Sequence, residues 1–365
     1  MEVALVHDYL TQRGGAERVV LSMLKAFPEA PLYTSLYAPR TTFPEFGNAE
    51  IRTLATNRVP LFQRHHRLAL PFLAPAFSRL RVRADVVLCS SSGWSHGVET
   101  DGRKIVYCYT PARWLYQKER YLGNGNANWL RRTALYALRS SLCRWDKRAA
   151  VRAHRYLTSS TAVQAQIREV YGIDAEIIPP PLPIEVRGPQ QKPDGLDPGF
   201  FLCVSRLLPY KNVDAVVEAF SRLPTEQLAV VGTGPEETRL RATAPTNARF
   251  LGAVEDEELR WLYNNTAGVI AASYEDYGLT PLEGAASGCP SAVLRWGGFL
   301  DTVVDGVTGV FFEKPEPAMI GAAVERLRRE EWSKETLQAH ARGFSEEAFL
   351  ARLREVVREE AAAAE

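Results

Sequence analysis

Two series of short apolar runs, each run followed by a polar or glycine-containing loop and then by a helical pattern, constrain the fold of this 365-residue chain most strongly. The runs of the first series are residues 3–6, 85–89, 104–108, 156–160 and 176–178. Those of the second are 200–205, 228–231, 249–251, 268–272, 291–294 and 310–312. Such alternation predicts parallel strands, because a crossover between parallel strands needs a helix-length connection. We therefore predict an α/β protein with two doubly wound, Rossmann-like domains that face each other across a cleft.

A proline-rich segment, residues 179–183, and the polar residues that follow it separate the two series. This composition is typical of a linker that is stiff at first and looser later. The chain also exceeds the length that one core usually supports. We predict an N-terminal domain over 1–183, a C-terminal domain over 184–344, and a last helix over 345–365 that packs back on the N-terminal domain.

The overall composition is that of a soluble globular protein, with 46% apolar and 24% charged residues. The five cysteines are scattered and form no Cys-x-x-Cys pair, which predicts reduced thiols in place of disulfides or a metal site. Residues 1–7 have no basic head and no long apolar run, so we expect a first strand and no signal peptide. No apolar run is long enough to cross a membrane, so we expect no spanning segment, and the reduced cysteines lead us to expect a cytoplasmic location.

Charge is unevenly distributed along the chain. Residues 1–185 carry 25 Lys and Arg against 15 Asp and Glu, whereas 186–365 carry 19 against 28. Within 51–83 apolar and basic side chains interleave: Phe62, Leu68, Leu70, Phe72, Leu73 and Phe77 with Arg58, Arg64, His65, His66, Arg67, Arg79, Arg81 and Arg83. The pattern fits a peripheral segment on an anionic bilayer, here the inner face of the cell membrane, or a helical hairpin packed on the N-terminal sheet.

Residues 273–290 carry the densest pattern of candidate site residues. Thr280, Pro281 and Glu283 predict a helix start, with Thr280 as N-cap, Pro281 at the first helical position and Glu283 closing a capping box. The free amides of residues 278–280 then form an anion site, flanked by the carboxylates of Glu275 and Glu283. The alternative is that Glu283 only caps its helix and Glu275 is solvated.

Other loops at predicted strand ends add cations and glycines, which suits a nucleotide diphosphate. Arg206 and Lys211 follow the strand 200–205, although Lys211 also fits a surface lysine at a helix start. Gly14 and Gly15 follow the first strand and fit either backbone approach to a ligand or a plain turn. They lack the spacing of the dinucleotide fingerprint, which excludes a nicotinamide dehydrogenase. His96 and Arg113 either contact substrate or serve loop hydrogen bonds.

The order of these motifs resembles the retaining glycosyltransferases of family 4 with the GT-B fold, and among them GDP-mannose-dependent mannosyltransferases of cell-surface polysaccharide biosynthesis. The residues that carry the resemblance are Ser205–Lys211, Gly232–Pro235, Phe250–Gly252 and Glu275–Glu283, with weaker support from His7-Asp8, Gly14–Glu17, Tyr107–Pro111 and Ile178–Pro180. The resemblance implies that the C-terminal domain binds the donor and the N-terminal domain the acceptor.

The same resemblance implies roles for single residues. Arg206 and Lys211 are expected to bind the donor diphosphate, and Glu275 to hold hydroxyls of the transferred sugar; these three form the expected catalytic group. The other expected donor contacts are Gly14, Gly15, Gly234, Val254, Gly278, Leu279, Thr280 and Glu283, with Glu283 on the ribose and the loop of Val254 beside the base.

The implied activity is transfer of α-mannose from GDP-mannose to a lipid-linked or oligosaccharide acceptor, with no metal or other cofactor and no nucleic-acid partner. In the front-face mechanism of the family Glu275 is a positioning group, in contrast to the nucleophile of a retaining glycosidase. Tyr109 stands where relatives often carry His on the donor sugar, which leaves a different hexose or a deoxy sugar open. UDP-glucose and UDP-N-acetylglucosamine are the alternative donors. A non-catalytic nucleotide-sugar-binding partner is the second alternative.

Overall fold

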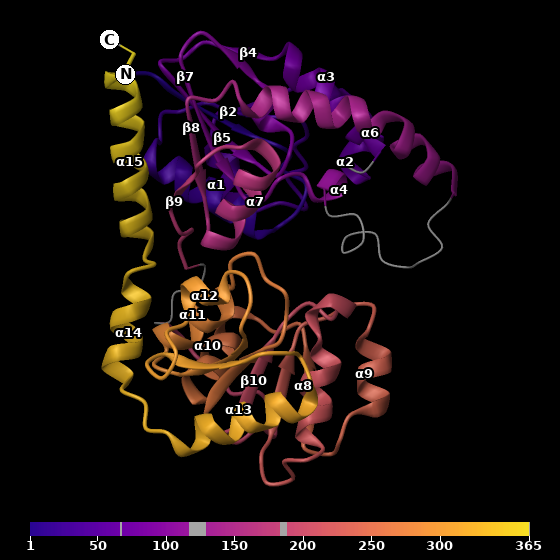
Figure 1. The fold of residues 1–365 in the computed structure, drawn as a ribbon, viewed down its shortest axis with the longest axis vertical. Helices are drawn as coiled ribbons and strands as arrows, with labels where there is room; N and C mark the ends of the chain where they lie inside the picture. The colour runs from indigo at the N-terminus through magenta and orange to yellow at the C-terminus, as the bar shows by residue number, and fades with distance from the viewer. Residues whose placement is uncertain (66–67, 117–128, 183–187, 365) are drawn as a thin grey trace. The chain divides into compact units, whose positions relative to one another are not determined.

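The computed structural model describes residues 1–65, 68–116, 129–182 and 188–364, with the backbone alone over 129–138. The chain divides into two compact units, which are shown in Figure 1. Unit 1 comprises residues 1–183 and 346–365, and unit 2 comprises residues 184–345. The predicted boundary between residues 183 and 184 lies outside the described residues.

Unit 1 contains a seven-stranded parallel sheet with the order β3-β2-β1-β5-β7-β8-β9. Its strands are β1 (Val3–His7), β2 (Leu32–Thr34), β3 (Ile51–Thr53), β5 (Val86–Ser91), β7 (Arg103–Cys108), β8 (Arg155–Thr158) and β9 (Glu176–Ile177). A separate two-stranded sheet pairs β4 (Arg81–Val82) with β6 (Glu99–Thr100). The strands β2, β3, β4 and β6 were not predicted.

Both faces of this sheet are covered, which explains why its central strands are apolar throughout. Alternate residues of β1 enter opposite cores: Val3 and Leu5 pack with α1 (Gly15–Ala26) and α15 (Glu346–Ala362), whereas Ala4 and Val6 pack with α3 (Leu70–Arg79) and α7 (Thr161–Tyr171). The remaining helices of unit 1 are α2 (Pro60–Arg64), α4 (Arg113–Tyr116), α6 (Trp129–Ala150) and the short 3₁₀ segments at Pro44–Asn48, Ala55–Arg58 and Ser95–Gly97.

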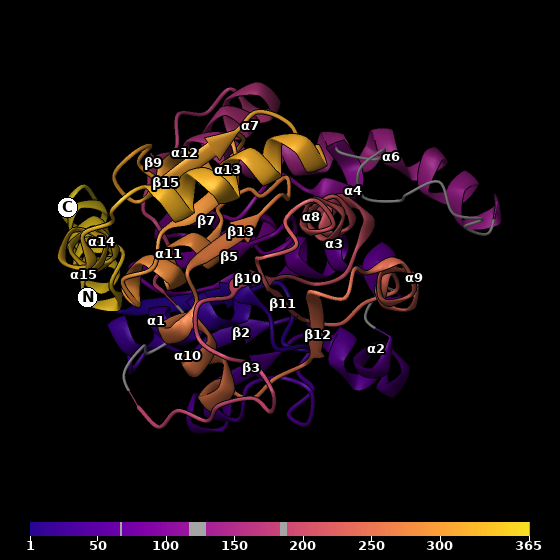
Figure 2. The ribbon, with the colours of Figure 1, turned by 90° about the horizontal axis from the view of Figure 1, so that it is seen from below.

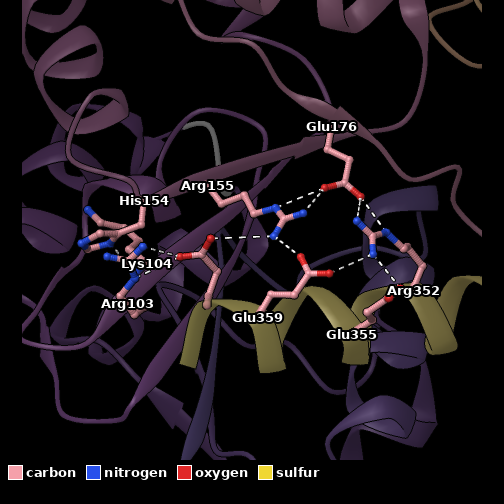
Figure 3. A network of polar contacts seen from close by, with 9 residues as sticks. Arg103, Lys104, His154, Arg155, Glu176, Arg352, Glu355 and Glu359 are labelled. Atoms are coloured by element: carbon pink, nitrogen blue, oxygen red, sulfur yellow. Dashed lines mark hydrogen bonds and ion pairs between the residues drawn. The ribbon is translucent and has the colours of Figure 1, made fainter. Parts of the chain in front are cut away.

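The C-terminal helix α15 is held on unit 1 by apolar packing and by a polar network (Figure 3). Leu353, Val356 and Val357 are buried against the sheet. Beside them, Glu176 of β9 accepts hydrogen bonds from Arg155 of β8 and from Arg352 of α15, the latter at 2.7 Å. Arg155 also pairs with Glu359 of α15. The helix therefore completes the core of a unit from which it is far removed in sequence.

Unit 2 contains a six-stranded parallel sheet with the order β12-β11-β10-β13-β14-β15. Its strands are β10 (Phe201–Val204), β11 (Leu228–Val231), β12 (Ala248–Gly252), β13 (Gly268–Ala271), β14 (Ser291–Leu294) and β15 (Gly309–Phe312). The predicted strands of this unit match these within one or two residues. In both units the chain winds outward from the first strand, returns, and winds in the other direction, which is the doubly wound topology.

The helices of unit 2 lie on both faces of its sheet (Figure 2). Phe201 and Cys203 of β10 pack with α8 (Val213–Phe220) and α13 (Pro317–Arg329). Leu202 points to the other face, where α10 (Asp256–Asn265) contributes Leu262 and Tyr263. The remaining helices are α9 (Glu237–Thr243), α11 (Leu279–Ala286), α12 (Phe299–Thr302), α14 (Lys334–Arg342) and the 3₁₀ segment Pro209–Lys211.

Candidate functional site

The candidate site of unit 2 lies where β10 and β13 are neighbours. The chain leaves β10 toward β11 on one side, and it leaves β13 toward β14 on the other. In doubly wound sheets ligands bind at this switch point, outside the carboxyl ends of the strands. The loop Ser205–Lys211 follows β10 and the loop Ser273–Gly278 follows β13. The topology therefore brings Arg206, Lys211 and Glu275 to one end of the sheet.

Lys211 and Glu275 form an ion pair across the switch point. The Lys211 ammonium group contacts Glu275 Oε1, and the Ser273 hydroxyl donates to the same oxygen at 2.9 Å. Their side chains are 11% and 28% exposed, so the pair is partly desolvated. Asn212 adopts a left-handed conformation with φ of 52° and donates through Nδ2 to the Ala272 carbonyl at 2.8 Å. This bond fixes the turn that carries Lys211 to the end of β13.

Arg206 lies on the exposed side of the same loop. Its Nη2 donates to the Tyr210 hydroxyl at 3.2 Å, and the Lys211 ammonium group lies 5.2 Å from the centre of the Tyr210 ring. Tyr210 thus contacts both cations. The structure brings together the three residues of the expected catalytic group, and it adds Ser273, Asn212 and Tyr210, which the sequence interpretation missed. Of these three residues, only Ser273 could have been found from the sequence, because it lies two residues before Glu275 at the end of a predicted strand.

Glycines in the loop after β11 allow it to pack against the loop after β10. Gly232 has φ of +123°, and a Cβ atom there would collide with the Ser205 carbonyl. A Cβ atom on Gly234 would collide with Leu207 O, while the Leu207 amide donates to the Thr233 carbonyl at 3.0 Å. Gly234 thus has a packing function, and donor contact remains a prediction. Val254 is half-buried beside the second apolar cluster of unit 2, and its place beside a base also remains a prediction.

The predicted start of α11 is wrong by two residues. Gly278 is the N-cap, with φ of 87°, and the helix begins at Leu279. This conformation favours glycine, and a Cβ atom would lie 2.5 Å from the Phe299 ring. Thr280 is therefore not the N-cap, and Pro281 stands in the first turn at the third helical position. Because first-turn amides have no intrahelical acceptor, those of Leu279 and Thr280 still suit an anion.

Glu283 does not close a capping box at this helix start. Its side chain is buried, and Oε2 accepts a hydrogen bond from the Tyr263 hydroxyl of α10. Burial and the neighbouring Glu283 raise the pKa of Tyr263 well above its usual value, so this hydroxyl stays a donor. The contact joins α10 to α11 and orients the carboxylate. Binding of a ribose by Glu283 remains a prediction.

In unit 1 the corresponding switch point lies between β1 and β5. Asp8, after β1, crosses to the loop after β5, where its carboxylate accepts from the amides of Ser92 and Ser95 at 2.7 Å each. Gly14 is the N-cap of α1 and Gly15 its first residue. Beyond its chain neighbours and the backbone of its own helix, no described heavy atom lies within 4 Å of a Cβ placed on Gly15, so this position leaves space for a ligand. Their contact with a phosphate remains a prediction.

His96 and Arg113 lie in different surroundings. His96 is buried: Nδ1 is 3.0 Å from the Ser91 hydroxyl, and Nε2 is 3.1 Å from Asp146 Oδ1. These contacts support the alternative that His96 serves internal hydrogen bonding. Arg113 begins α4 and is half-buried, and contact with substrate remains a prediction. Tyr109 donates to the Ala16 carbonyl at 3.1 Å and lies 2.9 Å from the Ser90 hydroxyl, so its side chain is fixed by the protein.

A resident metal has no obvious ligand set in the described part of the chain. No group of three or more His, Cys, Asp or Glu there is placed to hold an ion. The cysteines at positions 89, 108, 143, 203 and 289 are all free. Burial raises the pKa of the Cys89 and Cys203 thiols to about 12, so both remain protonated. Metal independence itself remains a prediction.

Each of the two units matches a protein-family model. Residues 13–186 match the family described as Glycosyltransferase Family 4, and residues 188–344 match the family described as Glycosyl transferases group 1. Each unit thus matches a family of glycosyltransferases over most of its length, and the two doubly wound sheets have the architecture of the GT-B fold.

Curated relatives match mainly over one part of the chain. A glycogen synthase of Thermus thermophilus is 35% identical over 173 residues, which is 45% of this chain and 40% of that protein. A D-inositol 3-phosphate glycosyltransferase of Geodermatophilus obscurus is 27% identical over 231 residues, covering 55% of this chain and 51% of that protein. The matched region thus spans between two fifths and about half of these relatives.

Solved structures resemble the whole chain in fold. A sucrose-phosphate synthase from Thermosynechococcus elongatus superposes with a TM-score of 0.74 at 17% identity and covers all of both chains. Anabaena Alr3699/HepE in complex with UDP superposes with a TM-score of 0.71 at 17% identity, covering 98% of this chain and 100% of that chain. A third structure holds the same Anabaena protein with UDP-glucose, with a TM-score of 0.70 at 16% identity and coverage of 98% and 100%.

Proposed function

We propose that this chain is a retaining glycosyltransferase that takes a sugar from a nucleotide donor, with Arg206 and Lys211 on the donor diphosphate and Glu275 on the transferred sugar. The observation that carries the proposal is the Lys211–Glu275 pair at the switch point of unit 2, with Arg206 and the start of α11 at the same end of the sheet. Charge develops on the diphosphate as the sugar departs, and fixed cations with helix amides stabilise it.

The ion pair has a definite role in this scheme. In the free protein Glu275 neutralises Lys211 and keeps it in a single position, supported by Ser273. A bound diphosphate offers Lys211 two or more anionic oxygens. The lysine then contacts the phosphate, and Glu275 becomes available to accept hydroxyls of the sugar. In the front-face route the acceptor hydroxyl enters on the side of the leaving group, and a phosphate oxygen takes its proton.

The proposed donor is GDP-mannose, with UDP-glucose and UDP-N-acetylglucosamine as the alternatives. The Anabaena protein of the same fold was solved with UDP-glucose, which supports including UDP sugars in the test. Titration calorimetry of the purified protein with all three donors, and with GDP and UDP, decides between them. GDP binding without UDP binding is expected, whereas UDP binding alone would assign the donor to the alternative class.

The proposed acceptor is a lipid-linked glycan at the inner face of the cell membrane. In the described residues no helix is long and apolar enough to cross a bilayer. Leu73 and Phe77 of α3 are buried in the unit 1 core, so the packed-hairpin alternative accounts for them. His66 and Arg67 lie outside the described residues.

Apolar side chains nevertheless remain exposed on this segment, namely Val59, Leu61, Leu68 and Phe72, beside the exposed Arg58, Arg64, Arg79, Arg81 and Arg83. We propose that these side chains contact an anionic bilayer. Flotation with phosphatidylglycerol liposomes tests this, with Phe72→Ser as the variant. Leu300→Ser is the matched control, because Leu300 is 51% exposed and Phe72 53%. Loss of flotation is expected for Phe72→Ser alone, and equal flotation of the two variants, or none by the parent, contradicts the proposal.

A further inference from the structure

Two buried polar atoms that the proposed function does not use lie in the loop after β1 and in the first turn of α1, which follows it. Glu17 is 1% exposed and Thr11 9% exposed. Among the described residues, none forms a hydrogen bond with Glu17 Oε2 or with Thr11 Oγ1. Buried polar groups in folded proteins are normally paired, and a carboxylate oxygen without a donor is especially costly. Two such atoms, one in this loop and one in the helix turn that follows it, indicate a site for a ligand.

Gly14 lies close to the carboxylate. A Cβ atom on Gly14 would lie 2.5 Å from Glu17 Oε2 and 3.3 Å from Gln12 Nε2, so a side chain at position 14 would collide with the carboxylate. Gly15 is exposed, and beyond its chain neighbours and the backbone of its own helix no described atom lies within 4 Å of a Cβ atom placed on it. Glycine at position 14 thus keeps the space beside the carboxylate free of a side chain.

The surroundings of Glu17 are rigid, which favours binding because little order is lost. Asp8 is held by the amides of Ser92 and Ser95, and the Tyr109 hydroxyl donates to the Ala16 carbonyl. Burial and, to a lesser extent, the nearby carboxylates of Glu17 and Asp8 raise the pKa of Tyr109. Tyr109 therefore stays a neutral donor whose hydroxyl is committed to Ser90 and Ala16, and it does not compete for Glu17.

A purely structural role explains Glu17 less well. An acid at the third helical position gains from the helix dipole, and in a capping box it accepts from the N-cap amide. Here no described hydrogen bond joins Glu17 to the Gly14 amide. Dipole stabilisation does not require burial of the carboxylate, because exposed acids at helix starts obtain it as well.

We propose that Glu17 accepts a hydrogen bond from a sugar hydroxyl in unit 1, with the Thr11 hydroxyl as a second contact. A polyol fits this pair, because a carboxylate accepts only and a threonine hydroxyl both donates and accepts. The inference rests on the proposed glycosyltransferase function, since it assigns a sugar-recognition role within that reaction. The sugar is that of either the donor or the acceptor.

The first test measures binding without turnover. Saturation-transfer NMR with D-mannose, D-glucose and N-acetylglucosamine is recorded on the parent, Glu17→Ala, Glu17→Gln and Thr11→Val. Glu29→Gln is the matched control, because Glu29 is exposed just beyond the end of α1. Hydrogen bonds to charged groups correspond to about 10-fold to 150-fold in affinity, so we expect at least a tenfold weaker signal for Glu17→Ala. Equal signals in parent and Glu17→Ala, or no sugar binding by the parent, would overturn the inference.

The second test assigns the sugar and separates recognition from folding. If the donor sugar contacts Glu17, Glu17→Ala raises KM for hydrolysis of the sugar nucleotide; if the acceptor does, KM rises only for transfer to alkyl glycosides. Either result supports the inference, provided that GDP or UDP affinity in unit 2 is unchanged. The thermal midpoint of Glu17→Gln is expected to equal or exceed that of the parent, because an unpaired buried charge is removed. A lowered midpoint with unchanged KM values would show that Glu17 is structural.

The two claims fail separately. A parent that hydrolyses a sugar nucleotide while its Glu17 variants behave identically refutes the role of Glu17 alone. A parent that binds a monosaccharide through Glu17 but neither binds nor turns over any sugar nucleotide refutes the proposed function alone.

Discussion

Replacement of Lys211 by Met tests the proposed chemistry most fully, because it removes a charge and keeps a long, unbranched side chain. In the free protein Lys211 pairs with Glu275 across the switch point, at 11% side-chain exposure. In the variant the Ser273 hydroxyl remains as a hydrogen-bond donor to Glu275. Two separate effects follow, one on stability and one on catalysis.

The stability effect is modest. Glu275 is 28% exposed, so water reaches it after the lysine charge is lost. Exposed ion pairs contribute up to about 1 kcal/mol, and breaking a fully buried pair costs about 3–5 kcal/mol. For this partly buried pair we expect a loss of about 1–2 kcal/mol in the free energy of unfolding. The variant therefore folds.

The catalytic effect is larger. If Lys211 contacts the leaving diphosphate, its charge stabilises the transition state more than the ground state. Removing one such contact typically costs about 10²–10³ in kcat. We expect donor hydrolysis by Lys211→Met to fall by at least about 10², with weaker binding of the nucleoside diphosphate in calorimetry.

Lys192→Met is the matched control, because Lys192 is an exposed lysine of unit 2 that pairs with Asp197 and lies near the Trp261 ring. Its hydrolysis rate should equal that of the parent. If Lys211→Met also hydrolyses the donor at the parental rate, the assignment of Lys211 to the diphosphate is refuted. A parent that binds sugar nucleotides without hydrolysis or transfer supports the non-catalytic alternative.

Three further predictions concern neighbouring features. Glu275→Gln should lower turnover, yet leave nucleoside diphosphate affinity unchanged or slightly tighter in calorimetry, because an anion beside the phosphate is removed; weaker diphosphate binding would contradict this. Gly278→Ala should lower the free energy of unfolding by about 1–3 kcal/mol, since its left-handed φ and the Phe299 ring both oppose a side chain. Gly199→Ala is the control, because Gly199 also has a positive φ but no atom near its Cβ position. Equal losses of stability in the two variants would refute a contribution of the Phe299 contact. Glu176→Gln should lower the thermal midpoint more than the exposed Glu355→Gln, because Arg155 and Arg352 each lose one carboxylate partner, whereas Glu355→Gln removes a partner of Arg352 alone (Figure 3).

The same network gives a pH dependence. Hydrogen bonds from Arg155 hold the pKa of Glu359 below its usual value. A carboxyl group with a lowered pKa in the folded state stabilises the fold above its unfolded pKa, and this contribution is lost as the pH falls through the folded value. Acidification below about pH 4 should therefore loosen α15 in the parent, as measured by amide hydrogen exchange of residues 346–362. Equal exchange at about pH 3 and at pH 7, after correction for the intrinsic rate, would contradict this.

Much of the fold followed from the sequence because apolar runs of three to six residues mark buried parallel strands. All six strands of unit 2 were predicted, and Gly232, Asn212 and Gly278 lie at the turns between them. Four strands of unit 1 were missed, namely β2, β3, β4 and β6. The first two are three residues each and the last two are two residues each, and β3 lies at the sheet edge with exposed Arg52 and Thr53, so it shows no apolar run.

The sequence predicted which residues form the site of unit 2, but it did not predict the contacts between them. Arg206, Lys211 and Glu275 were identified because they follow strands that a doubly wound sheet brings together. The start of α11 was misplaced because Thr280, Pro281 and Glu283 fit a capping box locally, whereas the long-range contact of Gly278 with Phe299 and of Glu283 with Tyr263 decides the geometry. The buried oxygen of Glu17 had no local signal, since its burial depends on tertiary packing around the glycine loop.

The measurement that tests the central claim most directly is a crystal structure of the protein with the sugar nucleotide that calorimetry selects. We expect the diphosphate within hydrogen-bond distance of Arg206, Lys211 and the amides of Leu279 and Thr280. In that complex Lys211 no longer contacts Glu275, and Glu275 accepts a hydrogen bond from a sugar hydroxyl. A diphosphate bound elsewhere, with Lys211 still paired to Glu275, would contradict it.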